Sequence, residues 1–134
     1  MIAIDTSVAI GFLRGDRASI NRLESAQRLT DSIGISSVSL FELLHPIRHR
    51  KLLEQEKVVK SFVRQLLILP LDSDAAEESA RIMGSLLRVS QPVNALDVLI
   101  AGTALANGVE SIITKDRDYE KIASVCDLKV EIMV

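Results

Sequence analysis

The stretch Met1–Ser7, with the sequence MIAIDTS, decides the fold and points to the functional site. A short apolar run ends there in one carboxylate, that of Asp5, and two hydroxyl groups. This pattern is typical of a buried strand in a parallel sheet that delivers an acid to the sheet edge. The stretch predicts a central strand over residues 2–5, and any further functional acids should lie close to Asp5 in the fold.

Four more strand patterns alternate with helical ones downstream. The strands are predicted over residues 33–36, 67–71, 111–114 and 128–132. Pro70 removes a hydrogen-bond donor from the third strand, and Lys129 and Glu131 alternate with apolar residues in the last, so both should be edge strands. Strands that alternate with helices, without a hairpin signal, predict a three-layer α/β fold. Its central sheet of four to five strands should be mostly parallel, with helices on both sides.

Capping residues and breakers bound the predicted helices of the first half. Thr6 or Ser7 can cap the first helix, and Ser37 or Ser39 can open a later one. Pro46 should break or kink this later helix, because proline lacks an amide hydrogen and its ring clashes with the preceding turn.

Two helices are predicted between the third and fourth strands. Residues 72–74 should cap the first of them, and Asp74 with Glu77 fits a capping box. Its buried stripe should hold Ala76, Ala80, Met83 and Leu87. Asn94 should cap the second, a strongly apolar helix over residues 95–106.

Length and composition bound the class of protein. The chain has 134 residues, a common size for one domain, and we expect a single domain over residues 1–134. No apolar stretch reaches the roughly 20 residues that span a bilayer, and no signal-peptide pattern is present, so we expect a cytoplasmic protein without membrane association. Cys126 is the only cysteine, which excludes a disulfide framework and a cysteine zinc site.

The charge argues against a protein that coats nucleic acid. The formal net charge is −2, whereas such proteins are usually basic. An enzyme that handles a nucleic acid at one site remains compatible with this charge. Arg14 lies past Asp5 and could reach a phosphate group. The basic cluster of Arg48, Arg50 and Lys51 could contact RNA, or it could be an ordinary solvated face.

Four acids follow predicted strands or lie in the first turns of predicted helices. They are Asp5, Glu42, Asp97 and Asp116, with Asp118 as a neighbouring alternative to the last. In open α/β sheets, ligands bind beyond the carboxyl ends of the strands, where the strand order reverses. Taken singly, Asp5, Glu42 and Asp97 have simpler explanations as helix caps or as charges that favour a helix N-terminus.

Taken together, the acids point to a divalent cation. Several carboxylates near one point repel each other, and at neutral pH one of them would bind a proton. A cation removes that penalty, and a carboxylate site without clustered histidine or cysteine suits Mg²⁺ or Mn²⁺. Such a metal lowers the pKa of a bound water and stabilises charge on a phosphoryl oxygen, so the pattern is that of a phosphodiesterase site.

Four segments of the chain resemble the PIN domain, and most closely the VapC type of toxin ribonuclease. The segments are residues 4–7 (IDTS), 36–43 (SSVSLFEL), 97–104 (DVLIAGTA) and 113–119 (ITKDRDY). Each segment is short, and the resemblance rests on all four standing in this order at these spacings. It spans nearly the whole chain.

The resemblance implies a metal-dependent endoribonuclease that a cognate antitoxin holds inactive and that forms a homodimer. The acids that bind Mg²⁺ or Mn²⁺ would be Asp5, Glu42 and Asp97, with Asp116 as a fourth, more variable acid. The polar supports would be Thr6 and Thr114, with Asp118 beside them. In such an enzyme, metal-activated water attacks an RNA phosphodiester and leaves a 5′-phosphate and a 3′-hydroxyl.

The chain departs from the family pattern after Glu42. Residues 44–51 bring in a proline and basic residues where many relatives continue one helix with a further acid. His45 and His49 have a spacing that can bind a metal, but the intervening proline and the missing glutamate favour a solvated helix end. Tyr119, the only tyrosine, is expected to pack at the sheet edge.

Other functions remain open at this point. A PIN-fold nuclease that processes RNA without an antitoxin fits the same residues, and so does a noncatalytic PIN-like module that only binds a partner. A phospho-acceptor receiver domain would need paired acids at its first strand. A haloacid-dehalogenase-like phosphatase would need a second aspartate where Ser7 stands.

Overall fold

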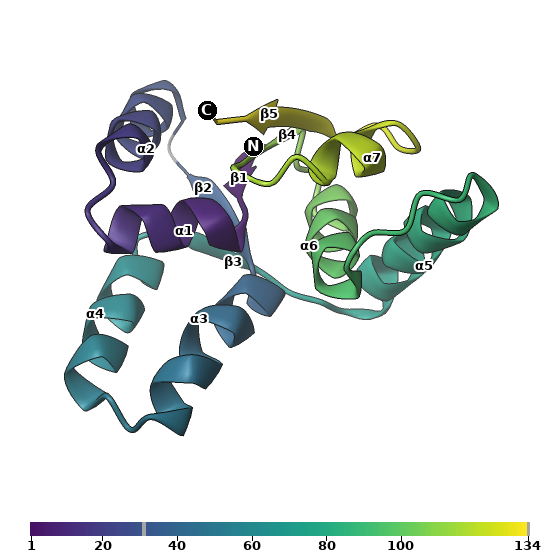
Figure 1. Ribbon diagram of the computed structural model, residues 1–134. Helices are drawn as coiled ribbons and strands as arrows, with labels where there is room; N and C mark the ends of the chain where they lie inside the picture. The colour runs from purple at the N-terminus through teal and green to yellow at the C-terminus, as the bar shows by residue number, and fades with distance from the viewer. Residues whose placement is uncertain (31, 134) are drawn as a thin grey trace.

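The computed structural model describes residues 1–30 and 32–133, in which strands and helices alternate as predicted (Figure 1). The strands are β1 (Ile2–Ile4), β2 (Ile33–Ser36), β3 (Leu67–Leu69), β4 (Ser111–Thr114) and β5 (Lys129–Ile132). The helices are α1 (Thr6–Leu13), α2 (Arg17–Leu29), α3 (Ser37–His49), α4 (Leu53–Val63), α5 (Ser73–Arg88), α6 (Ala95–Ala106) and α7 (Tyr119–Ala123). Within the described residues, no helix is both long and apolar enough to cross a membrane.

The five strands form one sheet in the order β3-β2-β1-β4-β5, and every pairing is parallel. The chain starts in the centre, builds outward to β3, and then returns across the sheet to add β4 on the other side of β1. Strand order therefore reverses between β1 and β4, where Ile4 pairs with Ile113. This is the position at which ligands bind in open α/β sheets. Asp5 directly follows β1, and Asp116 lies two residues beyond the end of β4. The predicted central strand and the two predicted edge strands are confirmed.

Alternate residues of the strands feed two separate apolar cores, one on each face of the sheet. Ile4 and Ile113 pack into the core made with α1 to α4. Ala3 and Ile112 point to the opposite face and pack with α5, α6 and α7. The sheet between two helical layers gives the predicted three-layer arrangement, which Figure 1 shows with α1 to α4 on one side and α5 to α7 on the other.

Two helices are capped by a residue other than the one predicted. The side chain of Asp5 caps α1 by accepting from the amide of Val8, so Thr6 and Ser7 are not the caps. Ser36 caps α3, in place of Ser37 or Ser39. Asp72, which lies within the predicted cap at residues 72–74, caps α5 by accepting from the amide of Ala75. In α1 and α3 the strand passes into the helix without a loop, and the last residue before the helix takes the cap. Asn94 caps α6 as predicted.

Pro46 does not break α3, which continues to His49. Of the predicted break or kink, the break is wrong: the helix continues although Pro46 has no amide hydrogen to donate to the carbonyl one turn earlier. Leu43 is buried and Ile47 packs against the same core, and these contacts hold the end of α3 in helical form.

Candidate active site

Asp5 is almost fully buried at the carboxyl end of β1, with 3% of its surface exposed. Its Oδ1 accepts from the hydroxyl of Ser7 at 2.6 Å and from the amide of Val8 at 3.2 Å, and its Oδ2 accepts from the hydroxyl of Thr114 at 2.5 Å. Burial raises the pKa of the Asp5 carboxyl despite these hydrogen bonds, which lower it. One carboxylate thus joins the ends of β1 and β4 while it caps α1.

Glu42 lies in α3 and is joined to α1 through Thr6. The hydroxyl of Thr6 donates to Oε1 of Glu42 at 2.6 Å and also lies 3.0 Å from the hydroxyl oxygen of Ser39. Thr6 is 9% exposed and Ser39 is fully buried. The predicted support role of Thr6 therefore corresponds to a specific contact, in which its hydroxyl fixes one oxygen of Glu42.

Asp97 stands in the first turn of α6 and is half-buried. Burial is the largest cause that raises the pKa of Asp97, from an ordinary 3.8 to about 7. The negative charges of Asp116, Asp5 and Glu42 raise it further. Asp97 also lines the same cavity as the other three acids.

Asp116 and Asp118 follow β4 and differ in what they face. The amide of Asp116 donates to the hydroxyl of Thr114 at 2.9 Å, and Oδ1 of Asp116 accepts from the amide of Asp118. Asp116 lines the cavity that also holds Asp5. The carboxylate of Asp118 instead forms a 3.6 Å ion pair with Lys121 on α7. The structure thus brings Asp116, and not Asp118, to the other acids.

A cavity of about 290 Å³ unites the four acids. Its lining residues are Asp5, Thr6, Ser7, Ile10, Glu42, Asn94, Asp97 and Asp116. No arginine or lysine is among them, so the described lining carries several carboxylates and no balancing cation. Oxygen donors without nitrogen or sulfur are the ligands that Mg²⁺ and Mn²⁺ prefer.

The four acids fit a metal ion in two respects: their oxygen donors suit Mg²⁺ or Mn²⁺, and they line one cavity. Among residues 1–30 and 32–133, no three acidic, histidine or cysteine side chains converge closely enough to enclose an ion. The distances between the carboxylates therefore do not define a coordination sphere. His45 stacks on Phe41, with the ring centroids 5.0 Å apart, and does not line the acidic cavity.

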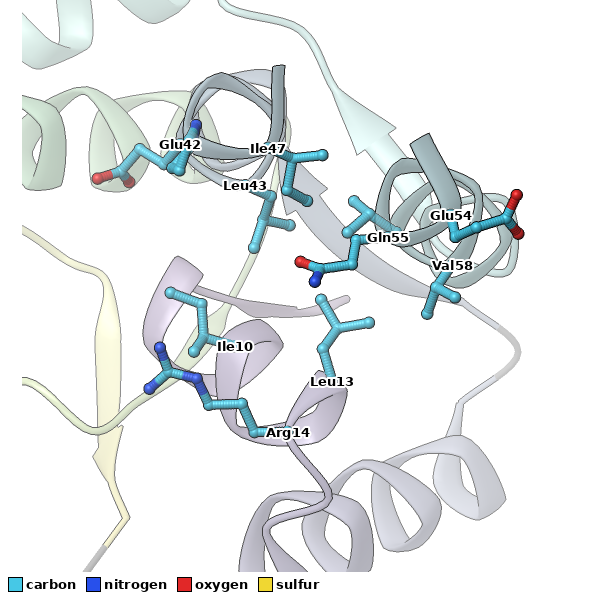
Figure 2. Close-up of a pocket in the computed structure, with 11 residues that line it drawn as sticks. Ile10, Leu13, Arg14, Glu42, Leu43, Ile47, Glu54, Gln55 and Val58 are labelled. Atoms are coloured by element: carbon cyan, nitrogen blue, oxygen red, sulfur yellow. The ribbon is translucent and has the colours of Figure 1, made fainter. Parts of the chain in front are cut away.

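A second and larger cavity, of about 430 Å³, adjoins the acidic one between α1, α3 and α4 (Figure 2). Its walls are mainly apolar, with Leu13, Leu43 and Val58 among them. Ile10 and Glu42 line both cavities. This apolar groove is therefore continuous with the acids.

The basic residues that were candidates for RNA contact lie in two places. Arg14 lines the apolar groove (Figure 2). Arg48 pairs with Glu56 of α4 at 2.8 Å, and Arg50 and Lys51 are exposed in the turn between α3 and α4. Arg50 stands eight residues beyond Glu42, which is about 12 Å along a helix. These three residues lie outside the acidic cavity.

Four further residues of the site were not singled out from the sequence. Ser7 and Ser39 belong to the hydroxyl network, and Ser7 could have been identified from the IDTS segment. Asn94 was expected only as a helix cap, yet it also lines the acidic cavity. The prediction that Tyr119 packs at the sheet edge missed its main polar contact: the residue is fully buried and its hydroxyl faces Asp97.

Comparison with known proteins assigns this architecture to a family. A PIN domain model matches residues 2–125. The tRNA(fMet)-specific endonuclease VapC of Shigella flexneri is 27% identical over 123 residues, which cover 91% of this chain and 92% of that protein. The enzyme of the same name from Salmonella typhimurium is 32% identical over 99 residues, covering 72% and 74% of the two chains.

Solved structures share the fold over nearly the whole chain. VapBC2 from Rickettsia felis, bound to a promoter DNA fragment, matches with a TM-score of 0.84 at 21% identity and covers 98% of both chains. DNA-bound VapBC from Salmonella typhimurium matches with a TM-score of 0.83 at 25% identity, covering 98% and 96%. The likeness extends to the connection between β1 and β4, since it spans both strands.

Proposed function

The chain belongs to the PIN-domain family, and from this premise we propose that it is an endoribonuclease, the toxin of a VapBC-type toxin–antitoxin pair. The observation that carries the proposal is the shared acidic cavity, lined by carboxylates from the end of β1, from α3, from α6 and from the turn after β4. Curated relatives that cover most of this chain are named as endonucleases and ribonucleases. Solved relatives are VapBC complexes.

We further propose that cleavage depends on Mg²⁺ or Mn²⁺, with Asp5, Glu42, Asp97 and Asp116 as the residues that hold the ion. When bound, such an ion supplies a nucleophile from water at neutral pH and stabilises charge on the phosphoryl group. The chain supplies the anionic oxygens. The hydroxyl groups of Thr6 and Thr114 orient two of the carboxylates, Glu42 and Asp5.

Asp97 is the acid whose protonation the site controls most strongly. With a pKa of about 7, it carries a proton on a large fraction of molecules at neutral pH. A bound cation favours the ionised form, so binding should release a proton from Asp97. The ribonuclease should therefore bind its metal more tightly as the pH rises from 6 to 8.

The decisive experiment is cleavage of RNA by the purified protein with Mn²⁺ and with EDTA. Initiator tRNA is the first RNA to test, because two relatives are named for it. Asp5→Asn and Asp97→Asn should each lower the cleavage rate by at least about 100-fold, since each removes an anionic ligand. The matched control is Asp127→Asn, which makes the same chemical change at an exposed position outside the cavity.

The outcomes separate the candidate functions. Cleavage that is undiminished by EDTA, or equal in the wild type and both variants, would refute the metal mechanism. No cleavage of any RNA would leave a noncatalytic PIN-like module as the better description. A neighbouring reading frame for a small DNA-binding protein would support the antitoxin, and its absence would favour an RNA-processing nuclease.

The apolar groove is the surface that best suits the antitoxin. An apolar segment of a partner seated there would contact Ile10 and Glu42, which also line the acidic cavity. Binding in the groove would thus restrict the approach of RNA to the acids. A homodimer and a cytoplasmic location stay predictions, which the solution mass and cell fractionation would test.

A further inference from the structure

Tyr119 is the first residue of α7 and the largest fully buried side chain of the described part of the chain. Its ring packs into the core that α5, α6 and α7 form on one face of the sheet. Its hydroxyl donates to Oδ1 of Asp97 at 3.4 Å. Within residues 1–30 and 32–133, Asp97 is the only side chain with which the hydroxyl makes a hydrogen bond.

The surroundings of this hydroxyl are unusual for a core tyrosine. Besides burial, the negative charges of Asp5, Asp97 and Glu42 raise the pKa of Tyr119 above its ordinary value of 10, and Asp116 acts in the same direction. A phenol of ordinary pKa is already protonated at physiological pH, so the Tyr119 hydroxyl is a hydrogen-bond donor. Tyr119 is fully buried and does not line the acidic cavity, so its hydroxyl acts on the cavity only through Asp97, which does line it.

A neutral donor has an advantage at this position. A lysine or arginine beside Asp97 would compensate the acidic charge and compete with a metal ion. A phenol hydroxyl directs one carboxylate oxygen without adding positive charge. Packing alone does not call for the hydroxyl, because phenylalanine would fill the same space, and a buried hydroxyl carries a desolvation cost.

We propose that Tyr119 is a positioning residue for the metal site: its hydroxyl holds Oδ1 of Asp97 and leaves the other carboxylate oxygen directed to the cation. The inference rests on the proposed metal-dependent function. Groups that hydrogen-bond to metal ligands typically contribute about 10- to 100-fold to metal affinity. The hydrogen bond to Asp97 is long, so we expect the lower end of this range.

The test is Tyr119→Phe, which deletes the hydroxyl and keeps the ring. Calorimetric titration of the RNA-free protein with Mn²⁺ at pH 8 should show affinity lower by about 10-fold. In cleavage assays the variant should need more Mn²⁺ but reach the wild-type rate at saturation, because Asp97 is still present. The matched control is Ile122→Val, a change in the same helix at a fully buried apolar residue of the same core.

Ile122→Val should lower the thermal midpoint and leave Mn²⁺ affinity at the wild-type value. Wild-type affinity in Tyr119→Phe would overturn the inference and leave the metal mechanism standing. Equal losses of affinity in Tyr119→Phe and Ile122→Val would also overturn it, since general loosening of α7 would then explain both. A wild-type protein that binds no Mn²⁺ would refute the proposed metal site and this inference with it.

Discussion

Asp5 serves at once as the cap of α1 and as the link between β1 and β4. Its two oxygens accept from Ser7, Val8 and Thr114. A capping role and a functional role are often treated as alternatives, but here the same carboxylate makes both sets of contacts. Because the helix and the neighbouring strand both fix it, Asp5 is oriented before any ligand arrives, and this preorganisation is what a metal ligand requires.

Asp97 makes the stability of the metal-free protein depend on pH. Its folded-state pKa of about 7 lies above the ordinary 3.8, so the folded state holds a proton that the unfolded state releases. The associated stability is present below about pH 4 and is lost as the pH rises toward 7. The pKa of Asp5 is raised as well, which acts in the same direction.

We therefore expect the metal-free protein to unfold at a lower temperature at pH 8 than at pH 5.5. Asp97→Asn should reduce this difference, because asparagine does not ionise. Thermal unfolding in EDTA at several pH values measures both effects. A wild-type midpoint that rises steadily from pH 5.5 to pH 8 would contradict the expectation.

Thr114 holds two partners at the end of β4. Its buried hydroxyl donates to Asp5 and accepts from the amide of Asp116. Thr114→Val keeps the shape and leaves both partners without their hydrogen bond, so we expect the free energy of unfolding to fall by about 1–3 kcal/mol. RNA cleavage should fall as well, because Asp5 and Asp116 are both released.

The matched control for Thr114→Val is Thr103→Val. Thr103 is also fully buried, but within residues 1–30 and 32–133 its hydroxyl donates only to the backbone carbonyl of Leu99 in the same helix. Urea unfolding and cleavage should show a smaller loss of stability and unchanged activity. Equal effects of the two changes on cleavage would mean that the network around Asp5 has no role in activity.

At the scale of elements, α5 buries a different stripe of residues against α6 from the one that its sequence pattern predicts. The sequence predicted a buried stripe at Ala76, Ala80, Met83 and Leu87. The structure buries the residues one position earlier: Ala75, Ser79, Ile82 and Leu86. Both residues are small or apolar at each of the four pairs of positions, so helical periodicity fits either stripe. The contact with α6 selects one of them.

Gly102 makes that contact possible. A Cβ atom there would lie only 2.7 Å from the backbone nitrogen and Cα of Ser79 on α5. Backbone atoms cannot move aside cheaply, so Gly102→Ala should force α5 and α6 apart and lower the free energy of unfolding by about 1–3 kcal/mol. Because α6 carries Asp97, Mn²⁺ affinity should fall too.

Gly84→Ala is the matched control for Gly102→Ala. Gly84 lies in α5, and a Cβ atom there would meet nothing within 4 Å. Alanine favours a helix over glycine by about 1 kcal/mol, so this change should stabilise the protein. If both substitutions stabilise equally in urea unfolding, the close approach of α5 and α6 does not hold in solution.

At the scale of the whole molecule, the reversal of strand order creates the site and the α3–α4 pair adds the groove beside it. In Figure 1, α3 and α4 extend together away from the sheet, joined at their far end. The groove opens between this pair and α1, and it meets the acids at Ile10 and Glu42. The two surfaces that the proposed toxin needs, one for RNA and one for its partner, are thus contiguous.

Val58→Asp tests whether the apolar groove binds the antitoxin and the acidic cavity cleaves RNA independently of it. Val58 lines the apolar groove and is 58% exposed, so a charge there should be tolerated by the fold. Affinity for the cognate antitoxin should fall by at least about 10-fold, because a charge is costly to bury in an apolar contact. RNA cleavage by the free protein should be unchanged. Leu29→Asp, at an exposed leucine outside the groove, is the control and should bind as the wild type does.

The sequence by itself determined the alternation of strands and helices, the central place of β1 and which four acids line one cavity. These features rest on short-range signals: a run of apolar residues, a hydroxyl or carboxylate at a helix start, an acid after a strand. A parallel sheet whose strand order reverses once brings the ends of β1 and β4 together. That Asp5 and Asp116 lie near each other therefore follows from the topology alone.

Only the tertiary structure decided how those residues meet. The bond between Asp5 and Thr114 joins residues 109 positions apart, and the contact of Tyr119 with Asp97 joins two elements whose spacing carries no local signal. The tertiary structure also decides that α3 continues beyond Pro46, because the packing of Leu43 and Ile47 into the core holds this part of the helix. The opening stretch MIAIDTS places an acid at the sheet edge and supplies the nearby Ser7 hydroxyl. The contact with Thr114 and the burial that raises the pKa of Asp5 come only from elements packed against it in the fold.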